Sequence, residues 1–324
     1  MACTKGCTKP MQLDQHSSRI GLGAIAVELG ENIREVEAIP GAREKFASLK
    51  LPMSSALLRY RHYRESALAP DEVIGRVVRR CLEHAGVAAS DIDMFILTSA
   101  DASFLADRKL VPSLLASHGL LRAVPMAIVS QECTGLLSAI HMAGSHIRSG
   151  LGRRILVASY DHGGLDADRI QPFGVVSDAA SACLVSSEEP LDFEVLGFAH
   201  YGDVRGMHGE DDFDQRQALI NKVNAAALAD AGMSLGGISK VFSTNFFWPL
   251  ATYYASTAGI SAASLHDETL LDVAHCLSAD ALVNLDHYQR KPEGQAGDRY
   301  LLQAFAMGLL ASMVVERRAP RPRT

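Results

Sequence analysis

Apolar positions along the chain follow two alternating patterns. Short apolar runs, such as residues 93–100 (DMFILTSA), have the length and composition of strands buried on both faces. Residues 70–86 instead place apolar side chains at helical spacing, between a Pro-Asp pair and a glycine. A helix over 134–150 and a strand over 153–161 continue the series. This alternation predicts an α/β fold whose strands are covered on both faces.

The second half of the chain repeats the pattern of the first. Three segments in the first half match three in the second, in the same order. The matched pairs are 82–99 with 228–245, 135–141 with 281–287 and, one residue out of register, 155–159 with 300–304. Such repetition predicts a duplicated α/β unit with two halves related by a pseudo-twofold axis. The strand-to-helix turn at Cys133 then meets the corresponding turn of the second unit, residues 275–280.

The duplication suggests four parts of the chain. We expect a flexible tail over 1–19 and a first half over 20–190 that carries Cys133. The second half follows over 191–316. The last residues, 317–324, are basic and rich in proline, and we expect them to fray.

Composition narrows the class of protein. The chain has 324 residues, 48% of them hydrophobic, and a formal net charge of −6. The acidic balance gives no support for a nucleic-acid partner. No apolar run reaches the roughly 18 residues of a membrane span, and the N-terminus lacks the pattern of a signal peptide. The six cysteines are scattered and do not suggest a disulfide framework, so we expect a cytoplasmic protein.

Two groups of residues have the chemistry of metal ligands but not the spacing. Cys3 and Cys7 lie in a polar segment with no second ligand pair. His208, Asp211 and Asp212 share a charged stretch, but no helical spacing relates them as ligands. The sequence therefore predicts no metal site and no resident cofactor.

Cys133 lies where a predicted strand turns into a predicted helix. A thiolate at such a point is stabilised by unpaired backbone N–H groups and by the helix dipole. The same N–H groups can hold the oxygen that becomes negative when a thioester is attacked. Thr134 and Gly135 are small and leave room for a substrate. A cysteine that only packs in the core would fit the same pattern, and spacing alone does not decide between them.

Residues 130–161 resemble the nucleophile region of the thiolase superfamily, specifically of ketoacyl-ACP synthase III. In that family a cysteine, a small residue and a glycine open a helix. The helix ends in Ser-Gly, and the following strand closes in aspartate, here Asp161. The resemblance implies that Cys133 is a nucleophile that accepts an acyl group from a thioester.

Further segments extend the resemblance over residues 20–316. Residues 173–185 resemble the family's Gly-Asp-Gly-Ala-Gly segment, with Asp178 kept, and residues 58–67 resemble its Arg-rich stretch. The resemblance implies an α/β, thiolase-like fold of two duplicated halves in five layers, α-β-α-β-α. It also implies a dimer, with acyl-CoA or an acyl carrier protein as the source of the acyl group.

The chain departs from the family's Cys-His-Asn constellation. The resemblance places Thr244 at the histidine position and Leu277 at the asparagine position. Those two donors normally hold the enolate oxygen formed when a malonyl thioester loses CO2. Removing one oxyanion donor typically lowers the rate by about 10²–10³. Decarboxylative condensation should therefore suffer more than simple acyl transfer, which needs a nucleophile, N–H groups and a base.

Other residues are candidates for the missing roles. Asn245 has an amide donor near the lost histidine position, and His275 is the nearest candidate base, followed by Ser278 and Asp280. A histidine in an apolar run is also typical of a core residue. Glu132, beside the cysteine, is a candidate base or substrate-orienting group, and its charge would raise the pKa of the thiol.

Two features bear on the substrate site. The resemblance puts Met307 at the middle glycine of a Gly-Gly-Gly turn whose backbone N–H is an oxyanion donor. Residues 245–254 are the densest aromatic stretch of the chain. Their side chains are expected either to pack a helix against the core or to form the wall of an acyl pocket. The family's CoA-stacking tryptophan has no counterpart in 51–66, since Trp248 is the only tryptophan.

Three functions follow as hypotheses. The first is an acyltransferase that moves an acyl group through Cys133, in polyketide or other specialised metabolism. The second is a ketosynthase that forms carbon–carbon bonds with a non-standard triad. The third is a catalytically degraded partner of an active synthase. We expect a homodimer, with a heterodimer as the alternative.

Overall fold

A computed structural model describes residues 19–319 except 102 and 189–190. The tails expected at 1–19 and 317–324 lie largely outside these residues. Within them, nine strands form one sheet. Its order is β5 (Val124–Ile128), β4 (Met94–Thr98), β6 (Arg154–Asp161), β7 (Ala179–Ser186), β1 (Gly21–Leu29), β8 (Phe193–Gly202), β11 (Leu309–Arg317), β10 (Arg299–Ala306) and β9 (Lys240–Phe242).

The sheet is divided at the contact between β1 and β8. These strands pair through only two residue pairs, Gly21 with Glu194 and Leu22 with Phe193. In the first half β4 pairs in parallel with both β5 and β6, and in the second half β9 pairs in parallel with β10. The remaining pairs are antiparallel. Each half thus combines parallel and antiparallel strands, and the halves splay apart from a narrow junction.

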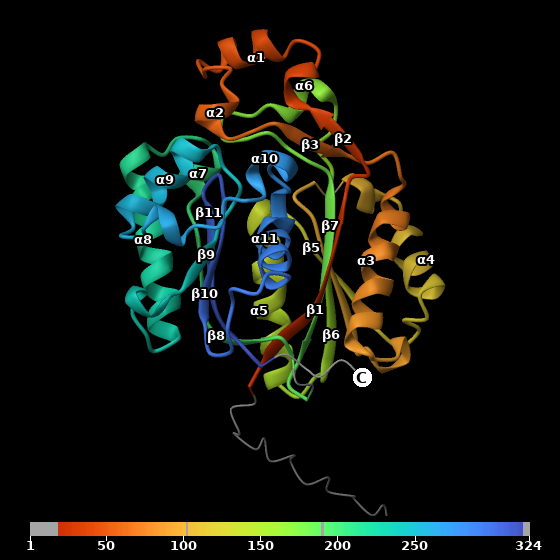
Figure 1. The fold of residues 1–324 in the computed structure, drawn as a ribbon. Coiled ribbons are helices and arrows are strands. Elements are labelled where there is room, and N and C mark those ends of the chain that lie inside the picture. Colours follow the sequence, from red (N-terminus) through yellow and green to blue (C-terminus); the bar gives the residue numbers. More distant parts are fainter. Residues whose placement is uncertain (1–18, 102, 189–190, 320–324) are drawn as a thin grey trace, which may run out of the picture.

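Helices fill the layers on both sides of each half (Figure 1). The outer face of the first half is covered by α3 (Pro70–Ala85) and α4 (Leu110–Ser117). Between the halves lie α5 (Gly135–Arg148) and α11 (Asp280–Gln289). The outer face of the second half is covered by α8 (Phe213–Asp230) and α9 (Trp248–Thr257). The predicted α/β, five-layered thiolase-like fold is therefore confirmed.

The two central helices are buried on nearly all sides. Leu136 and Ile140 of α5 pack in one cluster with Leu282 and Leu285 of α11 and with strands of both halves. The first seven residues of α11 are all buried, including the polar Asp280, Asn284 and Asp286, whereas the outer α3 has one buried face. The central layer therefore holds the two halves together and fixes the two turns that precede its helices.

The duplication predicted from sequence is visible in these turns. A 3-10 turn, η4 (Glu132–Thr134), precedes α5, and the turn η7 (Leu277–Ala279) precedes α11. The helix starts align Gly135 with Asp280, one residue away from the sequence match of 135–141 with 281–287. Cys133 therefore corresponds to Ser278. The repeat was correct, and its register in this segment was wrong by one residue, since the two helix starts are offset by 145 residues and the sequence match by 146.

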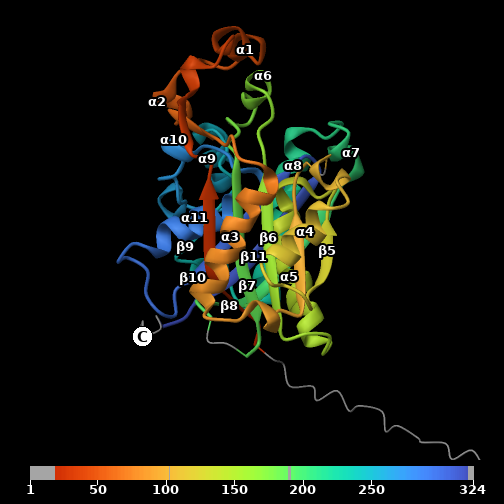
Figure 2. The same cartoon turned by 90° about the vertical axis from the view of Figure 1, so that its right-hand side faces the viewer.

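A small cap lies over one end of the sheet (Figure 2). Its two-stranded sheet pairs β2 (Asn32–Glu35) with β3 (His62–Glu65). The short helices η1 (Val36–Ala38), α1 (Ala42–Ser48) and α2 (Ser55–Leu58) contribute to the apolar core of the cap. The other short helices of the chain are η2 (Ala89–Asp91), η3 (Ser103–Ala106), α6 (Asp166–Arg169), α7 (Val204–Met207), η5 (Leu235–Gly237), η6 (Ala262–Ser264) and α10 (Leu270–Val273). Phe247 and Ala274, beside the turn at 275–280, pack in the apolar core of the cap.

Asp178, kept from the family motif, joins the cap to the sheet. Its carboxylate accepts two hydrogen bonds from Arg169, at 2.9 and 3.1 Å, and both side chains are buried. It also accepts from the backbone N–H of Ser66, in the Arg-rich stretch 58–67. The two motif segments therefore meet at the carboxylate of Asp178.

The part of the chain that the structure describes offers neither a membrane-spanning helix nor a cluster of three or more His, Cys, Asp or Glu side chains placed to hold a metal. Asp212 caps the start of α8, and Asp211 pairs with Arg216. Both have structural partners in the stretch considered for metal binding. Cys3 and Cys7 lie outside the described residues.

Candidate functional site

Cys133 lies in the turn η4, directly before α5. The turn brings it to the start of a 14-residue helix, which supplies backbone N–H groups and the positive end of a dipole. Its exposed fraction is 7%, whereas the other described cysteines, Cys81, Cys183 and Cys276, are 0% exposed. Cys133 is therefore the most accessible thiol in the described part of the chain, although it lies deep in the fold.

A histidine and an aspartate from the second half complete the site. His275 Nε2 lies 3.6 Å from the sulfur of Cys133, and His275 Nδ1 lies 2.5 Å from Oδ2 of Asp280. When Nδ1 donates its proton to the carboxylate, Nε2 is left as the acceptor that faces the thiol. The same carboxylate accepts hydrogen bonds from the backbone N–H groups of Cys276, at 2.6 Å, and Asn245, at 2.7 Å.

The electrostatics of this pair favour proton exchange. Burial raises the pKa of the Cys133 thiol, and the neighbouring imidazole of His275 opposes that rise. Burial lowers the pKa of His275, but the charge of Asp280 and the neighbouring sulfur outweigh burial and raise it. Asp280 thus stabilises the imidazolium that forms when the thiol gives up its proton.

A second buried carboxylate lies close to the first. Asp161 ends β6 and accepts from the backbone N–H groups of Ser278, at 3.0 Å, and Ala100, at 2.7 Å. It also accepts from the hydroxyls of Ser278 and Ser99. Burial raises the pKa of Asp161 to about 6. Ser278, the counterpart of Cys133, is therefore bonded to a carboxylate of the other half.

The side chain of Asn245 is used within the fold. Its amide Nδ2 donates to the carbonyl of Ala274 at 2.8 Å and to Thr269 Oγ1 at 3.4 Å. Its Oδ1 accepts from Asn284 at 2.9 Å. We expected this amide near the reacting centre as a donor, but the structure gives both of its donors structural partners. The reason is that the turn at Ala274 presents a buried carbonyl, and Thr269 presents a hydroxyl, to this amide.

Thr244 also has a structural contact, since its hydroxyl accepts from the backbone N–H of Phe305 at 2.9 Å. Met307 lies in the tight turn between β10 and β11 and is 48% exposed. Its backbone N–H donates to the carboxylate of Glu132, whose pKa is raised by burial. The backbone group expected to bind an oxyanion thus has a carboxylate beside it.

Leu277 supplies no polar side chain to the thiol. The resemblance placed it at the family's asparagine position, but the residue of this turn beside Cys133 is His275, two residues earlier. Leu277 and Ala274 both have positive φ, 50° and 59°, which changes the direction in which successive side chains point. The sequence signal was the pair His275 and Asp280, five residues apart around a helix start.

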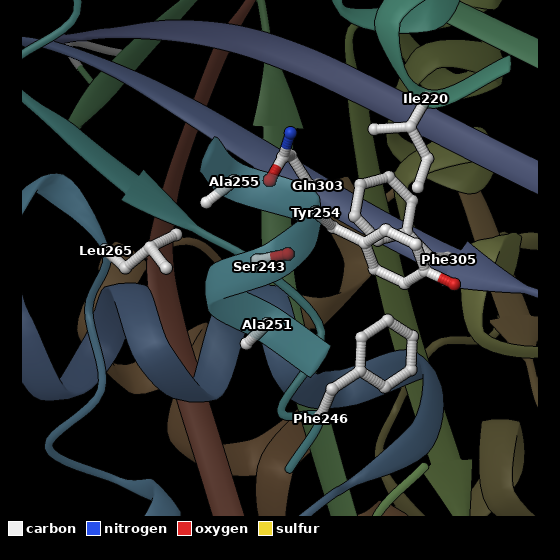
Figure 3. A pocket seen from close by; sticks show the side chains of 9 residues that line it. All are labelled: Ile220, Ser243, Phe246, Ala251, Tyr254, Ala255, Leu265, Gln303 and Phe305. Atoms are coloured by element: carbon white, nitrogen blue, oxygen red, sulfur yellow. The ribbon is translucent and has the colours of Figure 1, made fainter. Parts of the chain in front are cut away.

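Aromatic side chains pack around the imidazole. The ring centroids of Phe173 and Phe246 lie 5.6 and 6.3 Å from that of His275. Behind Phe246 is a cavity of about 10 Å³, room for about one water molecule (Figure 3). It is lined by Ile220, Ser243, Phe246, Ala251, Tyr254, Ala255, Leu265, Gln303 and Phe305. Phe246 and Tyr254, from the aromatic stretch 245–254, therefore serve as packing around a space too small for an acyl chain.

The chain is similar in sequence to enzymes named ketoacyl-ACP synthase III. Residues 129–203 match the family described as 3-oxoacyl-[acyl-carrier-protein (ACP)] synthase III. The beta-ketoacyl-[acyl-carrier-protein] synthase III of Sphingopyxis alaskensis is 31% identical over 143 residues, which cover 42% of each chain. The enzyme of the same name from Rhizorhabdus wittichii is 25% identical over 254 residues, 71% of this chain and 78% of the relative.

Comparisons of structure extend the likeness over almost the whole chain. ChlB3, described as an acyltransferase, superposes with a TM-score of 0.81 at 18% identity, covering 93% of this chain and 98% of that one. FabH of Pseudomonas aeruginosa, a 3-oxoacyl-(acyl carrier protein) synthase III, gives 0.75 at 17%, covering 94% and 100%. Cerulenin-bound OleA of Xanthomonas campestris gives 0.79 at 13%, covering 96% and 100%. These matches show a shared thiolase-like fold, and the sequence matches show that the chain is similar to ketoacyl-ACP synthase III enzymes.

Proposed function

We propose that the chain is an acyltransferase in which Cys133 accepts an acyl group from a CoA or carrier-protein thioester and passes it to an acceptor. We place the reaction in polyketide or other specialised metabolism. One observation supports the proposal: His275 contacts the sulfur of Cys133 through one ring nitrogen and the carboxylate of Asp280 through the other. A nucleophile, a base within reach and a group that orients the base form the arrangement used in covalent acyl transfer.

The first half-reaction uses each of these groups. His275 Nε2 takes the proton of Cys133, and the sulfur attacks the thioester carbonyl carbon, forming a C–S bond. The carbonyl oxygen becomes negative near the start of α5, where backbone N–H groups stabilise it. When the tetrahedral intermediate collapses, the old C–S bond breaks and the imidazolium returns its proton to the leaving thiol. Asp280 stabilises the imidazolium throughout.

The second half-reaction reverses these roles. An acceptor hydroxyl, amine or thiol gives its proton to His275 as it attacks the acyl-enzyme carbonyl. Cys133 then leaves and regains a proton from the imidazolium. The reaction needs no metal and no resident cofactor, because the acyl thioester enters as a substrate. A free thiol of this kind fits the reducing conditions of a cytoplasm.

Carbon–carbon bond formation is the second candidate, and the matches to enzymes named synthase III favour it. An enolate oxygen would need donors near Cys133. Asn245 uses its amide elsewhere, so this reaction would rely on His275 and backbone groups. We therefore rank acyl transfer first. A degraded partner subunit is ranked third, since Cys133 keeps a base, His275, beside its sulfur.

We also propose a homodimer formed through the exposed strand β5. This edge strand pairs only with β4 among the described strands, and Val124 on it is 58% exposed. Unpaired edge strands associate readily with other strands. Sedimentation of the chain and of its Val124→Lys variant tests this: we expect a dimer that the variant weakens.

Mass spectrometry tests the function directly. The chain is incubated with a panel of acyl-CoAs and acyl carrier proteins, and the peptide with Cys133 is examined for an acyl adduct. We expect an adduct that is absent in Cys133→Ala and retained in Cys183→Ala, a matched control that alters a fully buried cysteine of β7. The absence of any adduct, or one that survives Cys133→Ala, would contradict the proposal. Release of CO2 from a malonyl thioester would favour carbon–carbon bond formation. Co-purification with an intact homologue would favour a degraded partner subunit.

A further inference from the structure

The residue before His275 has an unusual backbone. Ala274 has φ 59° and ψ −150°, a combination that almost only glycine adopts. It is 4% exposed, so neither solvent nor a flexible surface loop accounts for the conformation. The turn it makes sends the next side chain, His275, toward Cys133. A strained conformation of this kind persists only when the surrounding structure holds it.

A network of buried amides surrounds this turn. Asn245 donates to the carbonyl of Ala274 at 2.8 Å. Asn284, on α11, donates to Asn245 Oδ1 at 2.9 Å and to the carbonyl of Ser243 at 3.0 Å. Thr269 donates its hydroxyl to Asn284 Oδ1 at 2.5 Å. Each amide atom of the two asparagines therefore has a partner, and the network is closed.

The same network reaches Asp280. The backbone N–H of Asn245 donates to Asp280 Oδ2, the oxygen that also binds His275 Nδ1. One residue thus holds both the peptide before the histidine and the carboxylate behind it. Neither Asn245 nor Asn284 has an amide group left to direct at a substrate.

We propose that Asn245 and Asn284 form a clamp that positions the His275–Asp280 pair against Cys133 by holding the peptide at Ala274 in its left-handed conformation. The inference rests on the proposed function only in taking Cys133 as a reactive thiol. Without the clamp the Ala274 peptide relaxes, the imidazole moves away from the sulfur, and the thiol loses its base. Asn245 and Asn284 are therefore positioning residues.

The test uses the full chain and needs no acyl substrate. Asn284→Leu keeps the approximate volume and removes the hydrogen bonds without adding charge. The rate at which iodoacetamide alkylates Cys133 is measured across pH by mapping the modified peptide. The titratable groups that face Cys133 within the described residues are His275, Asp280 and Asp161, and the variant changes none of them. We expect the rate at neutral pH to fall roughly tenfold and the midpoint of the profile to rise by about one pH unit.

Asn224→Leu is the matched control. Asn224 is also a buried asparagine, and its Oδ1 accepts hydrogen bonds from Gln303 and Ser312 on the strands under α8. Its loss should lower the stability of the fold and leave the alkylation profile of Cys133 unchanged. Thr269→Val, which removes one hydroxyl from the clamp, should shift the profile in the same direction as Asn284→Leu but less, and it serves if Asn284→Leu fails to fold.

A rescue variant separates positioning from simple stability. Glycine adopts the Ala274 conformation without strain, so adding Ala274→Gly to Asn284→Leu should regain part of the lost alkylation rate. The clamp is overturned if Asn284→Leu and Thr269→Val lower the melting temperature yet keep the wild-type profile. Failure of the proposed function would look different, with no acyl adduct while the clamp variants still shift alkylation.

Discussion

The two turns that precede the central helices have a similar backbone and differ in chemistry. Each has a 3-10 turn with a residue of positive φ, Glu132 at 43° in η4 and Leu277 at 50° in η7, directly before a central helix. At the next position the first turn presents Cys133 beside an imidazole, whereas the second presents Ser278 bonded to Asp161. The fold thus supplies one geometry twice, and the partners of each side chain decide which turn is reactive.

The residues that begin the two central helices extend this difference. Gly135 begins α5, and a Cβ at this position would lie 2.2 Å from Thr98 Oγ1, so the close packing requires glycine. Asp280 begins α11 and holds His275 with its carboxylate. The first half therefore contributes the thiol, and the second half contributes the base and its anchor.

Cys133→Ser makes the first turn resemble the second and has the largest expected effect. A serine hydroxyl has a far higher pKa than a thiol, so acylation should fall by roughly a thousandfold or more. Acyl transfer from the best thioester of the panel, followed by quenched mass spectrometry, measures the rate. Acylation within tenfold of the wild-type rate would mean that the acyl group is carried elsewhere.

Asp280→Asn removes the charge that holds the imidazole while keeping its shape. Without that charge the pKa of His275 falls and the wrong tautomer can face the thiol, so acylation should fall by roughly 10²–10³. The same quenched assay measures it. A loss under threefold would show that the carboxylate is only a helix cap.

Asp161→Asn tests how the second buried carboxylate affects the free energy of unfolding as pH changes. Burial raises the pKa of Asp161 from 3.8 to about 6. Between these values the folded chain holds a proton that the unfolded chain releases. This stabilising contribution is complete below pH 3.8 and is lost as pH rises through 6. From pH 4 to pH 7 the wild type should lose about 2–3 kcal/mol of unfolding free energy relative to the variant, measured by urea titration. A constant difference across this range would contradict the assignment.

Ser278→Ala removes the hydroxyl of the second turn and has the smallest expected effect on chemistry. Asp161 loses one buried hydrogen bond but keeps the backbone N–H of residue 278, so the free energy of unfolding should fall by about 1–3 kcal/mol. Acylation of Cys133 should stay within about twofold, since the hydroxyl lies in the unreactive turn. Loss of acylation on the scale of Asp280→Asn would show that the second turn takes part in the reaction.

Much of the fold was predictable because it follows from local pattern. The helix expected over 70–86 is observed as Pro70–Ala85, with Gly86 at its end in the left-handed conformation. The strand expected over 93–100 is β4, Met94–Thr98. Apolar periodicity, a proline at a helix start and a glycine after a helix end encode these elements in neighbouring residues.

The site was only partly predictable because it depends on backbone conformations that cannot be inferred from the residue types. Cys133, His275 and Asp280 were candidates from chemistry and position. Ala274 and Leu277 carry positive φ, which sequence alone gives no reason to expect of alanine or leucine. That geometry puts His275 beside the thiol and gives Asn245 a structural carbonyl to bind. Matching residues to a family position by spacing pointed to Leu277, whereas the polar side chain of this turn that reaches Cys133 is that of His275.

The release of thiol in the first turnover tests most directly whether Cys133 carries an acyl group. The chain is mixed with an excess of acyl thioester, quenched on the millisecond to second scale, and the free CoA or carrier-protein thiol is counted. A burst of one thiol per chain, absent in Cys133→Ala and slowed in Asp280→Asn, is the result we predict. A burst that persists in Cys133→Ala, or no burst with any thioester of the panel, would contradict it.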